Sequence, residues 1–393
     1  KDGISEDPII SLVDRFLYLA INIGASDIHL EPGKNEMRVR YRIDGVLHCQ
    51  KSIEKDKASQ VVSRIKVLGT LDIAEKRIPQ DGKIRVEFYV NDENHRDIDL
   101  RISTFPTLYG EKMVIRILDR LQHTKELESL GMNDSILTSM QRLLKQPHGF
   151  FLVTGPTGSG KTTTLYALIS QLNTDERNIV TMEDPIEYHI DGITQSQINE
   201  KAGFGFEEGM RSVLRQDPDV ILIGEIRDKK TVQIAIEAAL TGHLVLSTLH
   251  TNDAAGAITR LIDMGIEPFL ITASLNGVLA QRLARCLCQS CRIQVPLSGY
   301  EKRFIEEQGI GLKNGWGAEG CDKCNQMGYK GRLGLFEWLD VNDLICDLIV
   351  EKASVDKIRH AALANGMRTL GEDGLLKVRE GQISLEEYFR VGL

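Results

Sequence analysis

A glycine-rich segment beginning at Gly155 constrains the fold of this chain more than any other feature. It runs Gly155-Pro-Thr-Gly-Ser-Gly160-Lys161-Thr162 and fits the full spacing of a P-loop. The apolar run at 150–153 predicts a buried strand before it, and a helix is predicted to begin near Thr163. The alternative is a glycine-rich turn that matches by chance, and such a turn would lack this strand and helix. The segment therefore predicts a strand–loop–helix unit that binds phosphate groups.

The P-loop residues have distinct expected roles toward ATP and Mg²⁺. Its glycines allow backbone N–H groups to curl around phosphate oxygens, and the helix N-terminus adds positive potential. Lys161 is expected to reach the outer phosphates, and the Thr162 hydroxyl is expected to ligate Mg²⁺. The predicted nucleotide-binding residues are Gly155, Pro156, Thr157, Gly158, Ser159, Gly160, Lys161, Thr162 and Thr163.

Short apolar runs alternate with helical patterns in the region around the P-loop. Continuous apolar strands between helices are typical of a parallel sheet covered on both faces. We therefore predict an α/β domain over residues 129–284, with strands at 150–153, 179–182, 220–223 and 244–247.

Glu183, Glu225 and His250 follow the last three of these predicted strands. Ligands of open α/β sheets bind at the carboxyl ends of the strands, so all three side chains are expected to face the P-loop crevice. A carboxylate there orients the attacking water or holds the metal, and a histidine senses or stabilises the γ-phosphate. The alternative is a pair of surface carboxylates and a core histidine.

Arginines are candidates for stabilising the negative charge of phosphoryl transfer, because a guanidinium offers planar bidentate donors. Arg211 and Arg215 are four residues apart and are predicted to share one helix face. Arg101 and Arg116 lie on predicted strands of the N-terminal region. The alternative for each is a solvated surface residue.

The N-terminal region has a different pattern. A helix is predicted to begin with Asp7 as its cap and Pro8 in its first turn, and to end at Gly24. Alternating strands are predicted at 37–43, 84–88, 98–102 and 113–117. We therefore predict a small α+β domain around an antiparallel sheet over residues 1–122, followed by a polar linker at 123–128.

Two CxxC pairs, Cys288/Cys291 and Cys321/Cys324, predict a metal site. Four thiolates suit a tetrahedral Zn²⁺, and the lack of a histidine ligand indicates a structural site. The alternative is a pair of redox or free-thiol motifs, although neither pair has a thioredoxin-like context. Cys286 lies two residues before Cys288 and could take the place of one of the four ligands, which complicates their assignment. We predict a zinc-binding subdomain over residues 285–332 and a helical region over 333–393.

Charge and hydropathy limit the kinds of partner and compartment that fit this chain. Its 48 lysines and arginines stand against 56 acidic residues, a net charge of −8. This balance counts against a nucleic-acid binder, which usually carries a basic surplus. No apolar run approaches the ~20 residues that span a bilayer, and no secretory signal is visible. With an odd, clustered set of cysteines, these features predict a reducing, cytoplasmic compartment.

Together the motifs resemble those of the GspE/PilB secretion ATPases, the motors of type II secretion systems and type IV pili. The resemblance covers nearly the whole chain from about Ala25, and implies a RecA-like P-loop ATPase domain, a small N-terminal α+β (PAS-like) domain and a zinc-binding insertion. The matching segments are 25–32, 75–82, the P-loop, 182–187, 215–219, 224–228, 241–252 and the paired CxxC motifs.

The resemblance also implies roles for individual residues. The family's Asp-box falls on 183–187, its Walker B motif on 220–225 and its His-box on 241–252. Glu225 would be the catalytic carboxylate, and Gly224 stands where many P-loop enzymes carry aspartate. Two arginines, Arg101 and Arg116, correspond to arginines of the family's N-terminal domain that reach the nucleotide, and the others correspond to arginines of the RecA-like domain. The implied catalytic set is Glu225, Glu183, His250, Arg101, Arg116, Arg211, Arg215 and Arg227.

The function implied is ATP hydrolysis that drives pseudopilus assembly for protein export by a type II secretion system. The segments 195–199 and 162–167 resemble the type II branch more closely, and a pilus-extension motor is the alternative. Members are typically hexameric rings, so the resemblance implies a homo-hexamer at the cytoplasmic side of the bacterial inner membrane, in contact with platform proteins. Two other classes of function are alternatives: a nucleic-acid translocase, and a switch that binds ATP without hydrolysing it.

Overall fold

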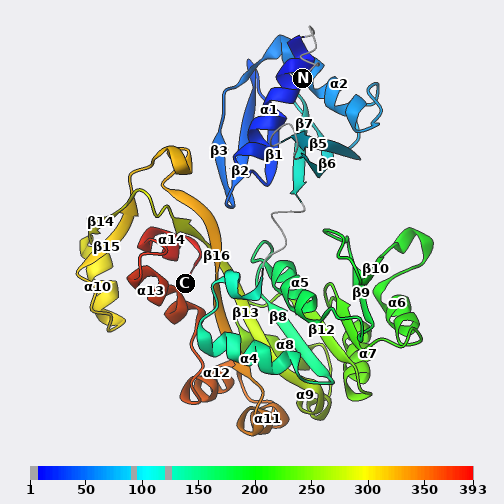
Figure 1. The fold of residues 1–393 in the computed structure, drawn as a ribbon, viewed down its shortest axis with the longest axis vertical. Helices are drawn as coiled ribbons and strands as arrows, with labels where there is room; N and C mark the ends of the chain where they lie inside the picture. The colour runs from blue at the N-terminus through cyan, green and yellow to red at the C-terminus, as the bar shows by residue number, and fades with distance from the viewer. Residues whose placement is uncertain (1–7, 90–94, 120–125, 393) are drawn as a thin grey trace. The chain divides into compact units, whose positions relative to one another are not determined.

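The computed structural model describes residues 8–89, 95–119 and 126–392, and the chain divides into two compact units, Lys1–His123 and Thr124–Leu393 (Figure 1). Asp7, the predicted helix cap, and residues 123–125 of the predicted linker lie outside the described residues. Each unit has its own buried apolar residues.

The first unit is built on an antiparallel sheet with the strand order β3-β2-β1-β7-β6-β5, and β4 pairs with β2. The predicted helix is confirmed as α1 (Pro8–Asn22), and the four predicted strands are confirmed as β2, β5, β6 and β7. A second helix, α2 (Lys55–Leu68), was not predicted because it is mostly polar and buries few apolar side chains. The strands are β1 (Asp27–Pro32), β2 (Glu36–Ile43), β3 (Val46–Cys49), β4 (Ile53–Glu54), β5 (Gln80–Tyr89), β6 (His95–Thr107) and β7 (Gly110–Asp119).

The second unit confirms the predicted α/β architecture. Its sheet has the order β10-β9-β11-β12-β8-β13-β16, and all of its strand pairs are parallel except β13 with β16. The four predicted strands correspond to β8 (Gly149–Thr154), β9 (Ile179–Glu183), β11 (Val220–Ile223) and β12 (Leu244–Leu249), and β10 (Thr194–Gln197) extends the edge beyond β9.

Both faces of this sheet are buried, which explains why its strands are continuous apolar runs. In β8, Phe150 and Leu152 pack in one core cluster, whereas Phe151 and Val153 pack in the other. The second cluster also contains residues of η1 (Leu127–Leu130), α4 (Asp134–Leu144) and α5 (Lys161–Leu172). The first contains residues of α6 (Phe206–Val213), α7 (Lys229–Leu240), α8 (Ala254–Asp263) and α9 (Pro268–Ser274).

Two long strands carry the chain from the sheet to the cysteine-rich segment and back. They are β13 (Leu275–Leu287) and β16 (Tyr329–Asp340), so the predicted boundaries at 284/285 and 332/333 fall inside continuous strands. Between them lie β14 (Arg292–Pro296), α10 (Gly299–Glu307), β15 (Asn314–Ala318) and η3 (Asp322–Cys324). The chain then continues with α11 (Asp343–Val350), α12 (Val355–Ala364), α13 (Leu370–Arg379) and α14 (Leu385–Arg390).

Within the described ranges, no helix combines the length and the apolar character that crossing a membrane requires.

Candidate functional site

The P-loop connects β8 to α5, and its backbone conformation depends on glycine. Gly155, Gly158 and Gly160 have φ angles of 146°, 79° and 88°, a region that other residues rarely adopt. A Cβ at Gly155 would lie 2.3 Å from the carbonyl oxygen of Gln281, so the loop also rests directly on β13. The helix begins at Lys161, slightly earlier than the predicted start near Thr163. These features hold the loop in the tight turn that a phosphate site requires.

The Lys161 ammonium lies over the P-loop itself. Its Nζ donates hydrogen bonds to the carbonyl oxygens of Gly155 at 2.8 Å and of Pro156 at 3.2 Å. Burial lowers the pKa of Lys161, and the negative charge of Glu225 opposes that shift. The lysine is therefore bound to the loop carbonyls and also interacts electrostatically with Glu225, which follows β11.

Glu225, His250 and Arg227 come together at the carboxyl ends of β11 and β12. Those strands are parallel neighbours, so their ends meet. His250 Nε2 lies 3.2 Å from Glu225 Oε2, and Arg227 forms an ion pair with Glu225 Oε1. The segment that follows β11 is also held by a hydrogen bond of 2.8 Å, which Thr248 Oγ1 on β12 donates to the carbonyl oxygen of Gly224. Both oxygens of the predicted catalytic carboxylate therefore have basic partners.

Glu183 has a different environment from the one predicted. It is the last residue of β9 rather than the first residue beyond it, so it shares a strand face with Thr181. Its carboxylate accepts hydrogen bonds from the hydroxyls of Tyr166 and Thr181 and from the Gln195 side chain. Only 3% of the residue is exposed, and burial raises the pKa of its carboxyl. None of the hydrogen bonds described for Glu183 involves Glu225 or His250.

The structure corrects the prediction that Arg211 and Arg215 share one helix face. Helix α6 ends at Val213, and beyond it Asp217 adopts a φ of 52° and is followed by Pro218. Arg211 remains on the helix and forms an ion pair of 3.3 Å with Glu207. Arg215 lies past the helix end and donates a hydrogen bond of 2.7 Å to the carbonyl oxygen of Arg211.

Arg101 and Arg116 lie opposite each other on β6 and β7 of the first unit. The Nε of Arg116 donates a hydrogen bond of 3.1 Å to Asp27 Oδ1, and 60% of its side chain is exposed. Arg116 is thus oriented by a carboxylate and retains an accessible guanidinium. The predicted action of both arginines on the nucleotide stays a prediction.

The four cysteines of the two CxxC pairs form one cluster. Their sulfur atoms all lie within 4.8 Å of one another, and the Cys288–Cys321 and Cys291–Cys324 sulfur distances are both 3.8 Å. A tetrahedral Zn²⁺ with Zn–S bonds of about 2.3 Å requires sulfur separations of about 3.8 Å, so the cluster fits zinc. Cys286 is not part of the cluster, which resolves the ambiguity in the sequence.

Backbone groups support one thiol of this cluster. The N–H groups of Cys321 and Gly328 each donate to Cys324 Sγ at 3.2 Å. Burial raises the pKa of the Cys324 thiol, but these donors, together with hydrogen bonds from the Cys321 and Cys291 thiols, outweigh it and bring that pKa to about 7. Such donors stabilise a thiolate, which is the form that binds metal.

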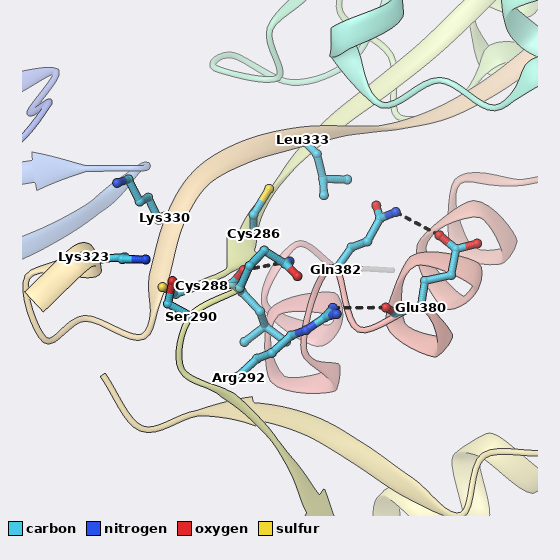
Figure 2. Close-up of a pocket in the computed structure, with 11 residues that line it drawn as sticks. Cys286, Cys288, Ser290, Arg292, Lys323, Lys330, Leu333, Glu380 and Gln382 are labelled. Carbon is cyan, nitrogen blue, oxygen red and sulfur yellow. Dashed lines mark hydrogen bonds between the residues drawn. The ribbon is translucent and has the colours of Figure 1, made fainter. Parts of the chain in front are cut away.

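A cavity of about 630 Å³ adjoins the cluster at the end of β13 (Figure 2). Arg292, Lys323 and Lys330 line it together with Cys288. The Arg292 guanidinium donates to the carbonyl oxygen of Gly381 at 2.8 Å. The cavity beside the cysteine cluster therefore has three positively charged side chains in its lining.

Comparisons with known proteins show which family the chain belongs to. A family model described as Type II/IV secretion system protein matches residues 3–390. The Type II secretion system ATPase E of Vibrio cholerae is 49% identical over 389 residues, which is 98% of this chain and 76% of that protein. The Type IV pilus assembly ATPase TfpB of Acinetobacter baylyi is 46% identical over 392 residues, which is 98% of this chain and 66% of that protein.

Solved structures have the same fold. The ATPase DotB of Legionella pneumophila matches with a TM-score of 0.68 at 21% identity, over 99% of this chain and 97% of that chain. The pilus retraction motor PilT with bound ADP matches with a TM-score of 0.59 at 26% identity, over 96% of both chains. Because the family model spans nearly the whole chain and several relatives are close to half identical, this protein belongs to the Type II/IV secretion system protein family.

Proposed function

We propose that this protein is an ATP-hydrolysing motor of a type II secretion system, and that hydrolysis drives pseudopilus assembly for protein export. The observation that carries the hydrolytic part is the pairing of Glu225 with His250 at the strand ends beside the Lys161 P-loop. The name of the Vibrio cholerae relative supports the assignment to type II secretion.

In this proposal the P-loop binds the ATP phosphates through its backbone N–H groups and Lys161. The Thr162 hydroxyl would hold Mg²⁺, which would supply positive charge beside the phosphates. Glu225 orients the attacking water, and His250 and Arg227 hold the carboxylate in place through their contacts with its two oxygens. The remaining predicted catalytic residues, Glu183, Arg101, Arg116, Arg211 and Arg215, stay proposals.

The contacts of Glu183 favour a structural role next to the P-loop helix. Its partner Tyr166 lies on α5, the helix that begins at Lys161, and its partner Gln195 lies on β10. Through these contacts Glu183 links the helix that carries the P-loop lysine to the edge of the sheet. We therefore propose that it acts through α5 rather than directly on water.

The proposed assembly is a homo-hexamer, located at the cytoplasmic side of the bacterial inner membrane and in contact with membrane platform proteins. Nucleic acid is not a proposed partner, given the net charge of −8. The solved relatives DotB and PilT, an ATPase and a pilus motor, support the ATPase class.

Deleting the gene in its host tests the secretion assignment. We expect the exported proteins to accumulate inside the cells while surface piliation is unchanged. A type IV pilus assembly motor is the second candidate, favoured by the name of the Acinetobacter baylyi relative. Loss of piliation with normal export would therefore replace the first assignment by the second.

Arg116→Ala is expected to lower kcat about tenfold or more while changing ATP affinity less than about threefold, because an arginine that stabilises transition-state charge acts mainly on the chemical step. Steady-state kinetics and nucleotide titration measure the two effects. Arg38→Ala is a matched control, since Arg38 is an exposed residue of β2 in the same sheet. Equal losses in both variants would show that Arg116 has no special role.

A further inference from the structure

Gln281 supports the P-loop from the neighbouring strand. Strand β13 runs parallel to β8 with Ala280 opposite Thr154, so Gln281 stands where the P-loop begins. Its Nε2 donates a hydrogen bond of 2.8 Å to the carbonyl oxygen of Ser159. Its Oε1 accepts one of 2.7 Å from Thr164 Oγ1, in the first turn of α5. One buried carboxamide, 2% exposed, thus joins the loop to the helix that follows it.

The orientation of this carboxamide follows from its partners. The Ser159 carbonyl oxygen can only accept, so the amide NH₂ group must face it. The Thr164 hydroxyl then donates to the amide oxygen. A Cβ at Gly160 would lie 2.8 Å from Gln281 Nε2, so the loop backbone is packed directly against the amide.

The hydrogen bond to Ser159 also orients the next N–H group. A peptide unit is planar and trans, so the Ser159 carbonyl and the Gly160 N–H point in opposite directions. Because Gln281 holds the carbonyl toward β13, the Gly160 N–H is turned away from that strand. Backbone N–H groups are the phosphate ligands of a P-loop, so this orientation matters for binding.

We propose that Gln281 is a positioning residue for nucleotide binding, which fixes the Ser159–Gly160 peptide so that the Gly160 N–H faces the phosphates. It acts through the loop and touches no substrate atom. The inference rests on the proposed nucleotide site. It assigns a role to a residue that lies 122 positions from its loop partner in the sequence.

Gln281→Leu, which has a similar volume and no hydrogen-bonding group, tests the proposal. We expect the dissociation constant of a fluorescent ATP analogue to rise about tenfold in the full chain with Mg²⁺, because the Ser159 carbonyl loses the donor that Gln281 supplies. At saturating ATP, kcat should stay within about threefold, since the catalytic carboxylate is not disturbed. Thr164→Val is the matched control, because it removes only the second hydrogen bond, and it should change the dissociation constant less than about threefold.

Gln281→Glu adds a readout that a purely structural role would not move. A neutral glutamic acid can donate to the Ser159 carbonyl and accept from Thr164, whereas an ionised one cannot donate. Burial raises the pKa of such a carboxyl. Relative to the unmodified chain, nucleotide affinity of this variant should therefore weaken as pH rises between about 5 and 8. Gln281→Leu should show no such added pH dependence.

The outcomes separate the two hypotheses. If the unmodified chain binds no nucleotide, the proposed site itself is wrong. If it binds nucleotide and the folded Gln281→Leu variant binds equally well, the role of Gln281 is overturned. Should Gln281→Leu fail to fold by circular dichroism, the Gln281→Glu series decides, and a pH profile parallel to that of the unmodified chain overturns the proposal.

Discussion

Glu225→Gln is expected to reduce ATP turnover by about 10²–10⁴-fold, because the variant loses the carboxylate that orients the attacking water. Binding of ATP should persist, since Glu225 is not part of the P-loop. The amide of glutamine has nearly the same size as the carboxylate and keeps one oxygen for His250. The loss would therefore reflect charge and proton acceptance rather than packing. Phosphate release under saturating ATP, together with nucleotide titration, measures both parts of this prediction.

Two further variants serve as comparisons for this experiment, one expected to lose activity and one expected to keep it. Lys161→Ala should abolish turnover and also weaken nucleotide binding, because the ammonium contacts the loop that binds the phosphates. Glu176→Gln changes the same chemical group at an exposed position, so it should behave like the unmodified chain. Normal turnover by Glu225→Gln would show that a group other than Glu225 activates the water.

Removal of one thiol from the cysteine cluster is expected to have the largest effect on stability. Structural zinc contributes about 10–16 kcal/mol in small zinc-finger peptides, and a smaller share is expected here because β13 and β16 restrain both chain ends. Cys321→Ser should therefore lose the metal and loosen the residues around the two CxxC pairs. Leu297 precedes α10 and Ile305 lies on it, and both pack in the core cluster that contains Phe150. The amide groups of α10 should therefore keep part of their protection from hydrogen exchange.

Elemental analysis and hydrogen exchange check this prediction. We expect one zinc per chain in the unmodified protein, almost none in Cys321→Ser, and fast exchange around residues 286–292 and 319–328 in the variant. Nucleotide binding should survive, while motor function should be lost. Cys286→Ser is the matched control, because Cys286 lies in the same segment but outside the cluster, and it should retain zinc. A zinc-free unmodified protein, or a Cys288–Cys291 disulfide in freshly reduced protein, would contradict the structural-zinc hypothesis.

Several features were fixed by local sequence alone. Strands β8, β9, β11 and β12 are recognisable because burial of both faces selects uninterrupted apolar runs. The P-loop is recognisable because its glycines, lysine and threonine serve a conformation and a charge that few other residues supply. The CxxC pairs are recognisable because a tetrahedral metal site needs closely spaced thiolates, whatever fold surrounds them.

Strand β13 shows where local pattern is misleading. Its residues Leu275, Leu279, Leu283 and Leu287 recur every four positions, which is a helical spacing. The segment is nevertheless a strand, because it pairs with β8 on one side and with β16 on the other. Hydrogen bonding to two neighbouring strands outweighs the local preference, and those neighbours are distant in the sequence.

The candidate site likewise has some features that follow from the sequence and others that depend on the tertiary structure. The sequence by itself predicted the P-loop, the positions of Glu225 and His250 just after buried strands, and the four cysteines that cluster, because these depend on residue type and on position within a short motif or next to a strand. Only the tertiary structure decided that Glu183 is enclosed by Tyr166 and Gln195, that α6 ends before Arg215, and that Gln281 supports the P-loop. The physical reason is that side-chain direction and long-range hydrogen bonds depend on which elements lie side by side, and no local pattern records that.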